Sequence, residues 1–363
     1  MDRRNFLQKP VLAAALAGVA LPAHAQGSPT VNWRLASSFP KTLEVNYGVA
    51  EVLSKRVAAL TDGKFNIRVF AGGEIVPPLQ VLDAVQNGSI QMAHSVSYYY
   101  FGKDETFAFD TTLPFGMTSR QHTAWMLYGG GMEATRELFK NYGIVNFLGG
   151  NSGTQMGGWF RKEIKTLNDL KGLKFRIGGF AGRVLQKLGV VAQQIPAGEI
   201  YQALEKGNID AAEWIAPFDD EKLGLYKIAP YYYTPGWWEG SAQLSFYVGQ
   251  KEWEALPAQY QAALEVASFE AHVRCQADWD ARNPLALARL LKQGAKLRTF
   301  SKPIMDASFA ATIEVVNETA ARNPRFKTVF NSWLKFRNDQ VEWFKVAEGN
   351  YANYIYNHPW KAG

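Results

Sequence analysis

The sequence of 363 residues contains very little cysteine and histidine: one cysteine, Cys275, and five histidines. A single cysteine cannot form an internal disulfide framework or a metal site built from several cysteines. The histidines show neither H-x-x-x-H nor H-E-x-x-H spacing, so we do not expect a zinc site.

Two further enzyme motifs are missing. The chain has no G-x-S-x-G elbow of a serine hydrolase and no G-x-G-x-x-G dinucleotide fingerprint. The glycines of 177–182 follow a predicted strand and open a predicted helix, but without the dinucleotide spacing. We interpret them as a tight turn, which can still present backbone N–H groups to an anion.

After the N-terminal segment no run of Lys or Arg occurs, and the formal net charge is only +6, so nucleic-acid binding is not expected.

Long hydrophobic runs are missing as well. The apolar stretch 11–21 is too short to span a bilayer; Arg3-Arg4-Asn5-Phe6-Leu7 precedes it and Ala23-His24-Ala25 follows it. This pattern predicts a twin-arginine export signal at residues 1–25, with an ordinary Sec signal as the alternative. With no second apolar run, we expect a soluble protein of the periplasm.

Aromatic residues are abundant: 11 Trp, 16 Tyr and 22 Phe. The length suits two domains. Residues 31–35 alternate like a strand, apolar residues from 45 to 60 have helical spacing, and Phe65, Ile67 and Val69 alternate again. A strand, a helix and a strand in succession predict an α/β fold with a parallel sheet.

Two short segments recur later in the chain, in the same order. Residues 84–93 resemble 203–212, and residues 33–37 resemble 175–179. The repetition predicts two α/β lobes of similar build. Because ligands of open α/β sheets lie beyond the carboxyl ends of the strands, we expect Ser97 to Tyr100 and Glu213-Trp214 to face a cleft between the lobes.

Arg176 is the residue with the clearest functional signal. It lies near the carboxyl end of a predicted interior strand, where a guanidinium requires an anionic partner. An internal pair with Asp210 or Glu199 and a bidentate clamp on a substrate carboxylate are both open.

A second cluster consists of Glu213, Trp214 and Glu239, beside the amide of Gln155. These oxygens suit a hard cation, or they serve only in ordinary hydrogen bonds. For Tyr231 to Tyr233 and Trp237-Trp238 we expect core or hinge packing.

The last third of the chain is predicted to be mainly helical. Residues 234–240 indicate a crossing loop between the lobes, and 243–248 a strand. Helices are expected at 258–283 and 285–293. From Phe326 to Ile355 aromatic and apolar residues recur mostly every 3, 4 or 7 positions, which predicts a helix of about 45 Å. Its aromatic face must be buried against something.

These segments resemble a known family, the solute-binding receptors of tripartite ATP-independent periplasmic (TRAP) transporters, and within it the subfamily that binds α-keto acids such as pyruvate. The likeness covers nearly the whole chain. It rests on Asp2-Arg3-Arg4, Trp33 to Lys41, Gln155 to Arg161, Arg176 with Gly178 to Gly182, Asp210 to Trp214, Asp219 to Gly224, and Tyr231 to Gly240.

The resemblance implies a two-lobed periplasmic-binding-protein-like fold with an interlobe cleft and a long C-terminal helix. It implies a receptor, with no catalytic residue, that delivers a 2-oxo or 2-hydroxy monocarboxylate to permease subunits of the membrane. The substrate-binding residues it implies are Tyr99, Tyr100, Asn151, Gln155, Arg176 and Glu213. The implied cation, Na⁺ with Ca²⁺ as the alternative, would be held by Gln155, Glu213, Trp214 and Glu239, and the subgroup forms dimers by exchanging the C-terminal helix.

We therefore expect lobe I at 26–150, completed by about 240–283, and lobe II at 151–235, completed by about 284–322. Residues 323–363 would form a helical dimerisation extension. Two other functions stay open: an exported enzyme acting on keto acids, and a sensory binding protein for another carboxylate.

Overall fold

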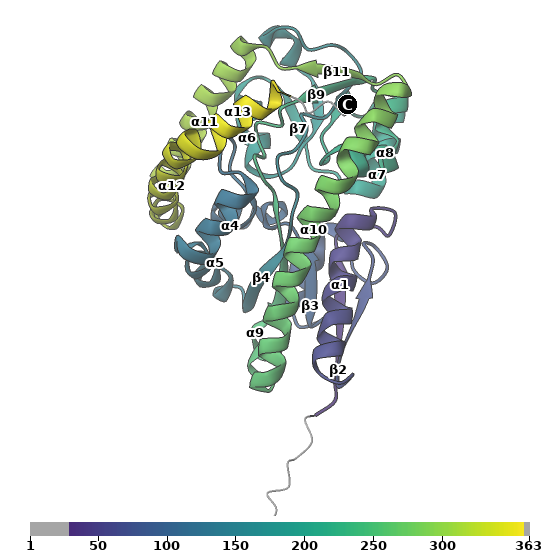
Figure 1. Cartoon of the computed structure of the whole chain (residues 1–363), viewed down its shortest axis with the longest axis vertical. Coiled ribbons are helices and arrows are strands. Elements are labelled where there is room, and N and C mark those ends of the chain that lie inside the picture. Colours follow the sequence, from purple (N-terminus) through teal and green to yellow (C-terminus); the bar gives the residue numbers. More distant parts are fainter. Residues whose placement is uncertain (1–28, 359–363) are drawn as a thin grey trace, which may run out of the picture.

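The computed structural model describes residues 29–358 of the chain (Figure 1). The predicted export signal at residues 1–25 lies outside the described residues. Within the described range the strands form two sheets, with helices packed around them. No helix of this range is both long and apolar enough to cross a membrane.

The first sheet has the strand order β2-β1-β3-β10-β4. The predicted parallel arrangement is confirmed for β1 with β2 and for β1 with β3, while β10 runs antiparallel to β3 and β4. Its strands are β1 (Val31–Ser37), β2 (Phe65–Phe70), β3 (Met92–Ser95), β4 (Ile144–Asn151) and β10 (Gln243–Gly249). Helix α1 (Glu44–Leu60) follows β1 and buries one apolar face, including Val49, Leu53 and Val57.

The second sheet has the order β11-β9-β5-β8-β6-β7. Strand β6 is parallel to β7 and β8, and the short β5 is antiparallel to β8 and β9. Its strands are β5 (Trp159–Phe160), β6 (Lys174–Arg176), β7 (Val191–Gln193), β8 (Ala211–Ala212), β9 (Tyr231–Thr234) and β11 (Lys296–Thr299). The chain passes from β9 of this sheet to β10 of the first sheet through residues 235–242, as expected of a crossing segment.

The internal repetition is visible in both sheets. Helix α2 (Val81–Gln86) leads through Gly88 into β3, and α7 (Ala197–Glu205) leads through Gly207 into β8. Gly88 and Gly207 have φ of +75° and +73°, a conformation that glycine adopts at little cost. In each sheet the strand so formed pairs in parallel with the other repeated strand, β1 or β6.

Helix α10 (Ala258–Lys292) corrects the prediction of two helices at 258–283 and 285–293. It is one helix that contains Pro284 and runs beside α1 and α8 (Pro217–Leu223) (Figure 1). An internal proline removes a backbone hydrogen bond at a cost of about 3 kcal/mol. The helix continues because buried residues such as Trp279 and Leu290 pack on both sides of the proline.

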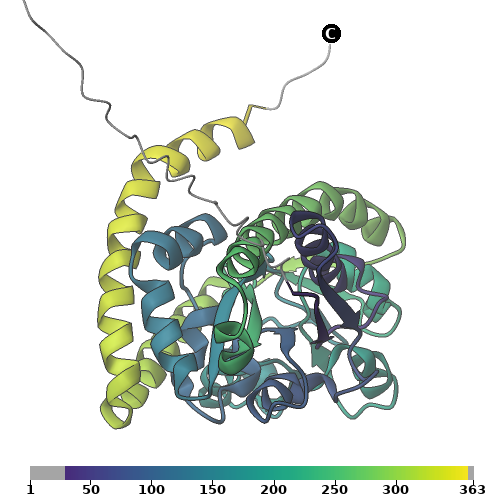
Figure 2. The same ribbon diagram turned by 90° about the horizontal axis from the view of Figure 1, so that it is seen from below.

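The C-terminal helix is longer than the part that its own chain covers. Helix α12 (Pro324–Phe344) buries Phe326, Val329 and Trp333. A π-helical turn at Lys345–Gly349 then leads into α13 (Asn350–Tyr356), which bends to one side and stands clear of the rest of the molecule (Figure 2). The predicted long helix is therefore confirmed as a continuous helical segment from Pro324 to Tyr356, and the π-turn adds a bend that the pattern did not predict.

The aromatic residues of the crossing region pack in the interior, as predicted. Tyr232 stacks on Trp159 with 3.8 Å between ring centroids, and its hydroxyl donates to Asp220 at 2.7 Å. Trp237 and Trp238 are buried against each other. The remaining helices are α3 (Ala108–Thr111), α4 (Ser119–Tyr128), α5 (Gly131–Lys140), α6 (Gly179–Lys187), α9 (Gln250–Glu254) and α11 (Lys302–Arg322).

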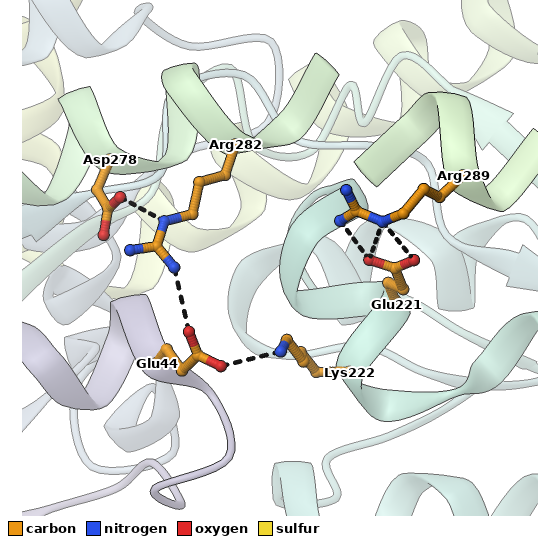
Figure 3. A network of polar contacts seen from close by, with 6 residues as sticks. All are labelled: Glu44, Glu221, Lys222, Asp278, Arg282 and Arg289. Atoms are coloured by element: carbon orange, nitrogen blue, oxygen red, sulfur yellow. Dashed lines mark hydrogen bonds and ion pairs between the residues drawn. The ribbon is translucent and has the colours of Figure 1, made fainter. Parts of the chain in front are cut away.

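Ion pairs connect α1 with helices that pack near the second sheet (Figure 3). Glu44 of α1 accepts from Lys222 of α8 at 2.9 Å and from Arg282 of α10 at 3.1 Å. Glu221 of α8 pairs with Arg289 of α10 at 2.7 Å. Most of these side chains are partly exposed, so each pair contributes little to stability.

Candidate functional site

The candidate site lies between the two sheets, at the carboxyl ends of strand β1 of the first sheet and of strands β6 and β8 of the second. Arg176 is the last residue of β6, and Glu213 and Trp214 follow the neighbouring parallel strand β8. From the first sheet, Phe39 follows β1 and its ring contacts Trp214 edge-on, with 6.4 Å between centroids. The predicted cleft edges therefore face each other.

Arg176 is the centre of this site and is only 1% exposed. Its Nη1 donates to the backbone oxygen of Glu213 at 2.6 Å and to Oε2 of the same residue at 2.8 Å. Its Nε donates to the carbonyl of Ile195 at 3.1 Å. The guanidinium also stacks on the Trp214 ring at 4.8 Å, so the group is held firmly in one position.

The structure does not support the internal partners considered for Arg176. Asp210 accepts instead from the backbone N–H of Lys174 at 3.0 Å, and Glu199 lies exposed in the first turn of α7. The partner is Glu213. The Nη2 of Arg176 has no hydrogen-bond partner within residues 29–358, so one side of the fork is available to a ligand carboxylate.

Glu213 and Glu239 are two buried carboxyl groups beside one arginine. Burial raises the pKa of Glu213 well above its ordinary value, and the charge of Glu239 raises it further. Burial raises the pKa of Glu239 to about 8, against the opposing effects of Arg176 and of a hydrogen bond from Tyr98. Two carboxylates outnumber one guanidinium here, so the site attracts either protons or a cation.

Gln155 is held between these groups by its backbone. Its N–H donates to the carbonyl of Glu239 at 3.1 Å, and its carbonyl accepts from Gly236 at 2.9 Å. The next N–H, that of Met156, donates to Ile215 at 2.9 Å. Segment 155–156 therefore joins the crossing segment to the residues that follow β8.

Three buried oxygens in this cluster have no hydrogen-bond partner in the described part of the chain: Gln155 Oε1, Glu213 Oε1 and Glu239 Oε2. The amide nitrogen of Gln155 donates to Ser152 at 3.1 Å, which identifies Oε1 as the free atom. Carboxylate and amide oxygens are ligands of hard cations. The residues present therefore fit the cation implied by the resemblance, although no group of three or more His, Cys, Asp or Glu within the described residues could hold a metal.

The tyrosines after β3 have different positions. Tyr99 is a neighbour of Arg176, and its pKa is raised to about 12 by burial against the opposing charge of that arginine. The hydroxyl of Tyr100 accepts instead from the backbone N–H of Leu82 at 3.2 Å, and its ring packs near Phe107 and Tyr247. In this structure Tyr100 therefore packs away from the cluster around Arg176, and its predicted place in the binding pocket gains no support. Three consecutive residues of a short 3₁₀ turn point in different directions, and the sequence does not show which one faces the site.

Tyr98 is the residue of this run that the expected ligand set omitted. It contacts Glu239, and its ring lies against the turn between β6 and α6. A Cβ at Gly178 would come within 2.7 Å of Tyr98 Cε2, and one at Gly179 within 2.8 Å of Tyr98 Cβ. The glycines thus allow the half of the molecule built on the first sheet, which carries Tyr98, to approach the half built on the second sheet, which carries this turn.

Asn151, the last residue of β4, is fully buried. Its Oδ1 accepts from Gly153 at 3.0 Å, and its Nδ2 has no partner within the described range. Pattern analysis also missed Asn46 of α1, which lines a pocket together with Phe39, Tyr99 and Gln155. Asn46 stands in an otherwise apolar helix face, and this was the one available signal.

Comparisons with known proteins agree with this geometry. The family model described as bacterial extracellular solute-binding protein, family 7, matches residues 36–323. The chain is 44% identical over 360 residues to a monocarboxylate 2-oxoacid-binding periplasmic protein of Nostoc sp., covering 98% of this chain and 99% of that protein.

Two solved structures are similar over most of their length. A TRAP transporter solute-binding protein from Bordetella bronchiseptica is 55% identical with a TM-score of 0.90, covering 91% of this chain and 98% of that one. It is a dimer of mixed occupancy with copurified calcium and picolinate in one active site and an apo second site. A TRAP periplasmic solute-binding protein from Pseudoalteromonas atlantica, with bound sodium and pyruvate, is 41% identical with a TM-score of 0.88, covering 90% and 99% of the two chains.

Proposed function

Because the chain belongs to family 7 of the bacterial extracellular solute-binding proteins, we propose that it is the extracytoplasmic receptor of a TRAP transporter. It binds a small 2-oxo monocarboxylate such as pyruvate together with a cation, and it delivers this cargo to the permease subunits in the membrane. The observation that carries the proposal is the cluster of Arg176 with three buried oxygens, of Gln155, Glu213 and Glu239, that have no partner within residues 29–358.

Each residue of the cluster has a separate role in the proposed binding mode. Arg176 is fixed by Glu213 and Ile195, so its free Nη2 binds the carboxylate of the cargo. Gln155, Glu213 and Glu239 hold the cation with their side-chain oxygens, together with the backbone oxygen of Trp214. When bound, the cation would supply positive charge to the oxygens of the cargo, and these four residues would hold it in place.

This binding mode explains why the cargo carries a second donor atom beside its carboxylate. A 2-oxo or 2-hydroxy acid offers two oxygens to the cation, whereas a simple fatty acid of equal length offers only its carboxylate. The picolinate of the Bordetella bronchiseptica protein likewise has a ring nitrogen next to its carboxylate. Asn151 and Tyr99 complete the proposed pocket.

Removal of the cation tests the proposal. We expect the Kd of pyruvate, measured by calorimetry, to rise about 10- to 100-fold after exhaustive removal of Na⁺ and Ca²⁺, since charged contacts contribute about 1.5–3 kcal/mol each. Adding back either ion restores binding. Undiminished affinity in the depleted protein contradicts the role of the cation.

Arg176→Ala is the matched variant for the carboxylate contact. It removes one partner of a buried charge pair, and we expect it to weaken pyruvate binding by about 2–5 kcal/mol in the presence of the cation. If the variant binds pyruvate normally, Arg176 has only a structural role. Pyruvate recovered unchanged after long incubation distinguishes a receptor from an exported enzyme.

The remaining proposals concern location and assembly. Residues 1–25 direct the folded protein to the periplasm by the twin-arginine route. Lobe I is formed by 26–150 with about 240–283, and lobe II by 151–235 with about 284–322.

The exposed aromatic face of the C-terminal extension, residues 323–363, is covered by a second copy of the chain. Trp343 and Tyr356, which are 56% and 79% exposed, support this proposal.

A further inference from the structure

A small pocket extends from the carboxylate cluster toward the first sheet. It shares Gln155 with the cluster, and much of its wall is apolar, including Phe39, Ile215 and Leu244. The space open to the centre of a water molecule is about 10 Å³, close to what one water requires. The pocket therefore adjoins the proposed binding residues, since Tyr99, Gln155 and Trp214 also line it.

Asn46 is the exception in this wall. It is 1% exposed, and neither its Nδ2 nor its Oδ1 has a hydrogen-bond partner among the described residues. The indole N–H of Trp214, which lines the same pocket, is also unpartnered there. Buried polar side chains nearly always have partners, so a donor and an acceptor left free at one place indicate a polar ligand group.

The position of Asn46 in its helix also indicates a role in binding a ligand. It occupies the third position of α1, after Glu44 and Val45, where a side chain can fold back and cap the first turn. No such cap is formed, and the buried neighbours Val45, Tyr47 and Val49 are apolar. Neither helix capping nor core packing explains an amide at this place.

We propose that Asn46 is the subsite that recognises the far end of the cargo, and that the preferred cargo is a 2-oxo acid whose side chain ends in an amide or hydroxyl group. This inference rests on the proposed function, because the carboxylate end of the cargo must be held by Arg176 and the cation. Pyruvate, which has only a methyl group, binds but does not use the Asn46 subsite.

Two ligands of equal shape provide a sharp test. 2-Oxosuccinamate ends in an amide, and 4-methyl-2-oxopentanoate has two methyl groups in its place; pyruvate serves as the reference without a tail. The substitution Asn46→Leu makes the corresponding exchange in the protein. Kd values are measured by calorimetry for all three acids with saturating Ca²⁺.

We expect wild-type protein to bind 2-oxosuccinamate at least 10-fold more tightly than 4-methyl-2-oxopentanoate. In Asn46→Leu this ratio should fall at least 10-fold, while the Kd of pyruvate changes less than 3-fold. Asn208→Leu, at an exposed position after α7, is the control and should leave all three values unchanged. If Asn46→Leu does not fold, Asn46→Ala must show the same loss of preference.

Three results overturn the inference. The wild-type protein shows no preference for the amide, or the variant weakens all three acids equally, as a structural role would require. The third is that wild-type protein binds none of the acids, pyruvate included; this alone means that the proposed function itself has failed.

Discussion

At the scale of single residues, the charge of the site depends on whether Glu239 carries a proton. With Glu213 ionised in its pair with Arg176 and Glu239 protonated, the carboxylate of the cargo leaves one negative charge, which one further positive charge neutralises. With Glu239 ionised, two positive charges are needed. The pKa of Glu239, raised to about 8 by burial, therefore makes the choice between a monovalent and a divalent cation depend on pH.

The same raised pKa predicts how the cation-free protein responds to pH. Between about pH 4.5 and 8 the folded state keeps a proton on Glu239 that the unfolded state has lost, so the free energy of unfolding falls as pH rises. The fall approaches about 1.4 kcal/mol per pH unit. Glu239→Gln removes this contribution, and Ca²⁺ should stabilise the wild-type protein most above pH 8, where it displaces no proton.

Urea unfolding at pH 5, 6.5 and 8, with and without Ca²⁺, measures this effect. Asp110, Asp219 and Asp220 are also buried, with pKa values raised to about 6, 7 and 6, and they contribute to the slope in both proteins. The difference between wild type and Glu239→Gln therefore reports Glu239 together with Glu213, whose pKa is also raised by the charge of Glu239. Parallel stability curves for the two proteins would contradict the prediction.

The sequence predicted the residues whose position follows from topology. Arg176 and Glu213 end neighbouring parallel strands, and this requires them to be close. It did not predict that they pair, because the choice among Asp210, Glu199 and Glu213 depends on side-chain direction. Asn46 was not predicted because no sequence pattern distinguishes a free amide from a bonded one.

At the scale of elements, the turn from β6 into α6 limits how closely the two halves approach. Gly178 has φ of −99° and ψ of 166°, which any residue can adopt, so a substitution there adds a side chain without backbone strain. Its Cβ would lie 2.7 Å from Tyr98 Cε2. The contact exists only when the halves are together.

We therefore expect Gly178→Ala to weaken pyruvate binding by about 10-fold, a cost of about 1.4 kcal/mol, because Tyr98 must move away from Glu239. The melting temperature of the ligand-free protein should change little. Gly182→Ala is the matched control in α6, since its Cβ would come no closer than 3.4 Å to Ala192. Equal pyruvate affinities of the two variants would show that this turn does not limit closure.

The helices show where local pattern is a weak guide. Pro284 predicts a helix end, yet α10 continues through it because its contacts with α1 and α8 lie on both sides. The periodicity after Phe326 correctly predicts one long helical segment, but it does not predict the π-turn at Lys345–Gly349 that bends it. In both cases tertiary packing or a backbone irregularity changes the course of a helix that the local pattern alone does not fix.

At the scale of the whole molecule, the contacts between the two halves differ in strength. The exposed ion pairs of Glu44 with Lys222 and Arg282 (Figure 3) contribute at most about 1 kcal/mol each. The buried cluster around Arg176 involves desolvated charges, whose pairing depends on the cargo and the cation. The buried apolar cluster that joins Leu35 and Phe39 to Trp159 and Trp214 therefore contributes more to the contact between the two sheets than the surface ion pairs do.

The C-terminal extension leads to the last prediction. Helix α12 is anchored on its own chain by Phe326, Val329 and Trp333. Helix α13 stands clear of the rest of the molecule (Figure 2), and its Tyr351, Tyr354 and Tyr356 are exposed. Removing residues 345–363 should therefore leave the fold and the pyruvate affinity unchanged but convert a dimer to a monomer, as measured by light scattering. The double substitution Tyr351→Glu and Tyr354→Glu should act in the same way without shortening the chain. A full-length chain that is monomeric at micromolar concentration, or a shortened chain that stays dimeric, would show that a second copy does not cover this face.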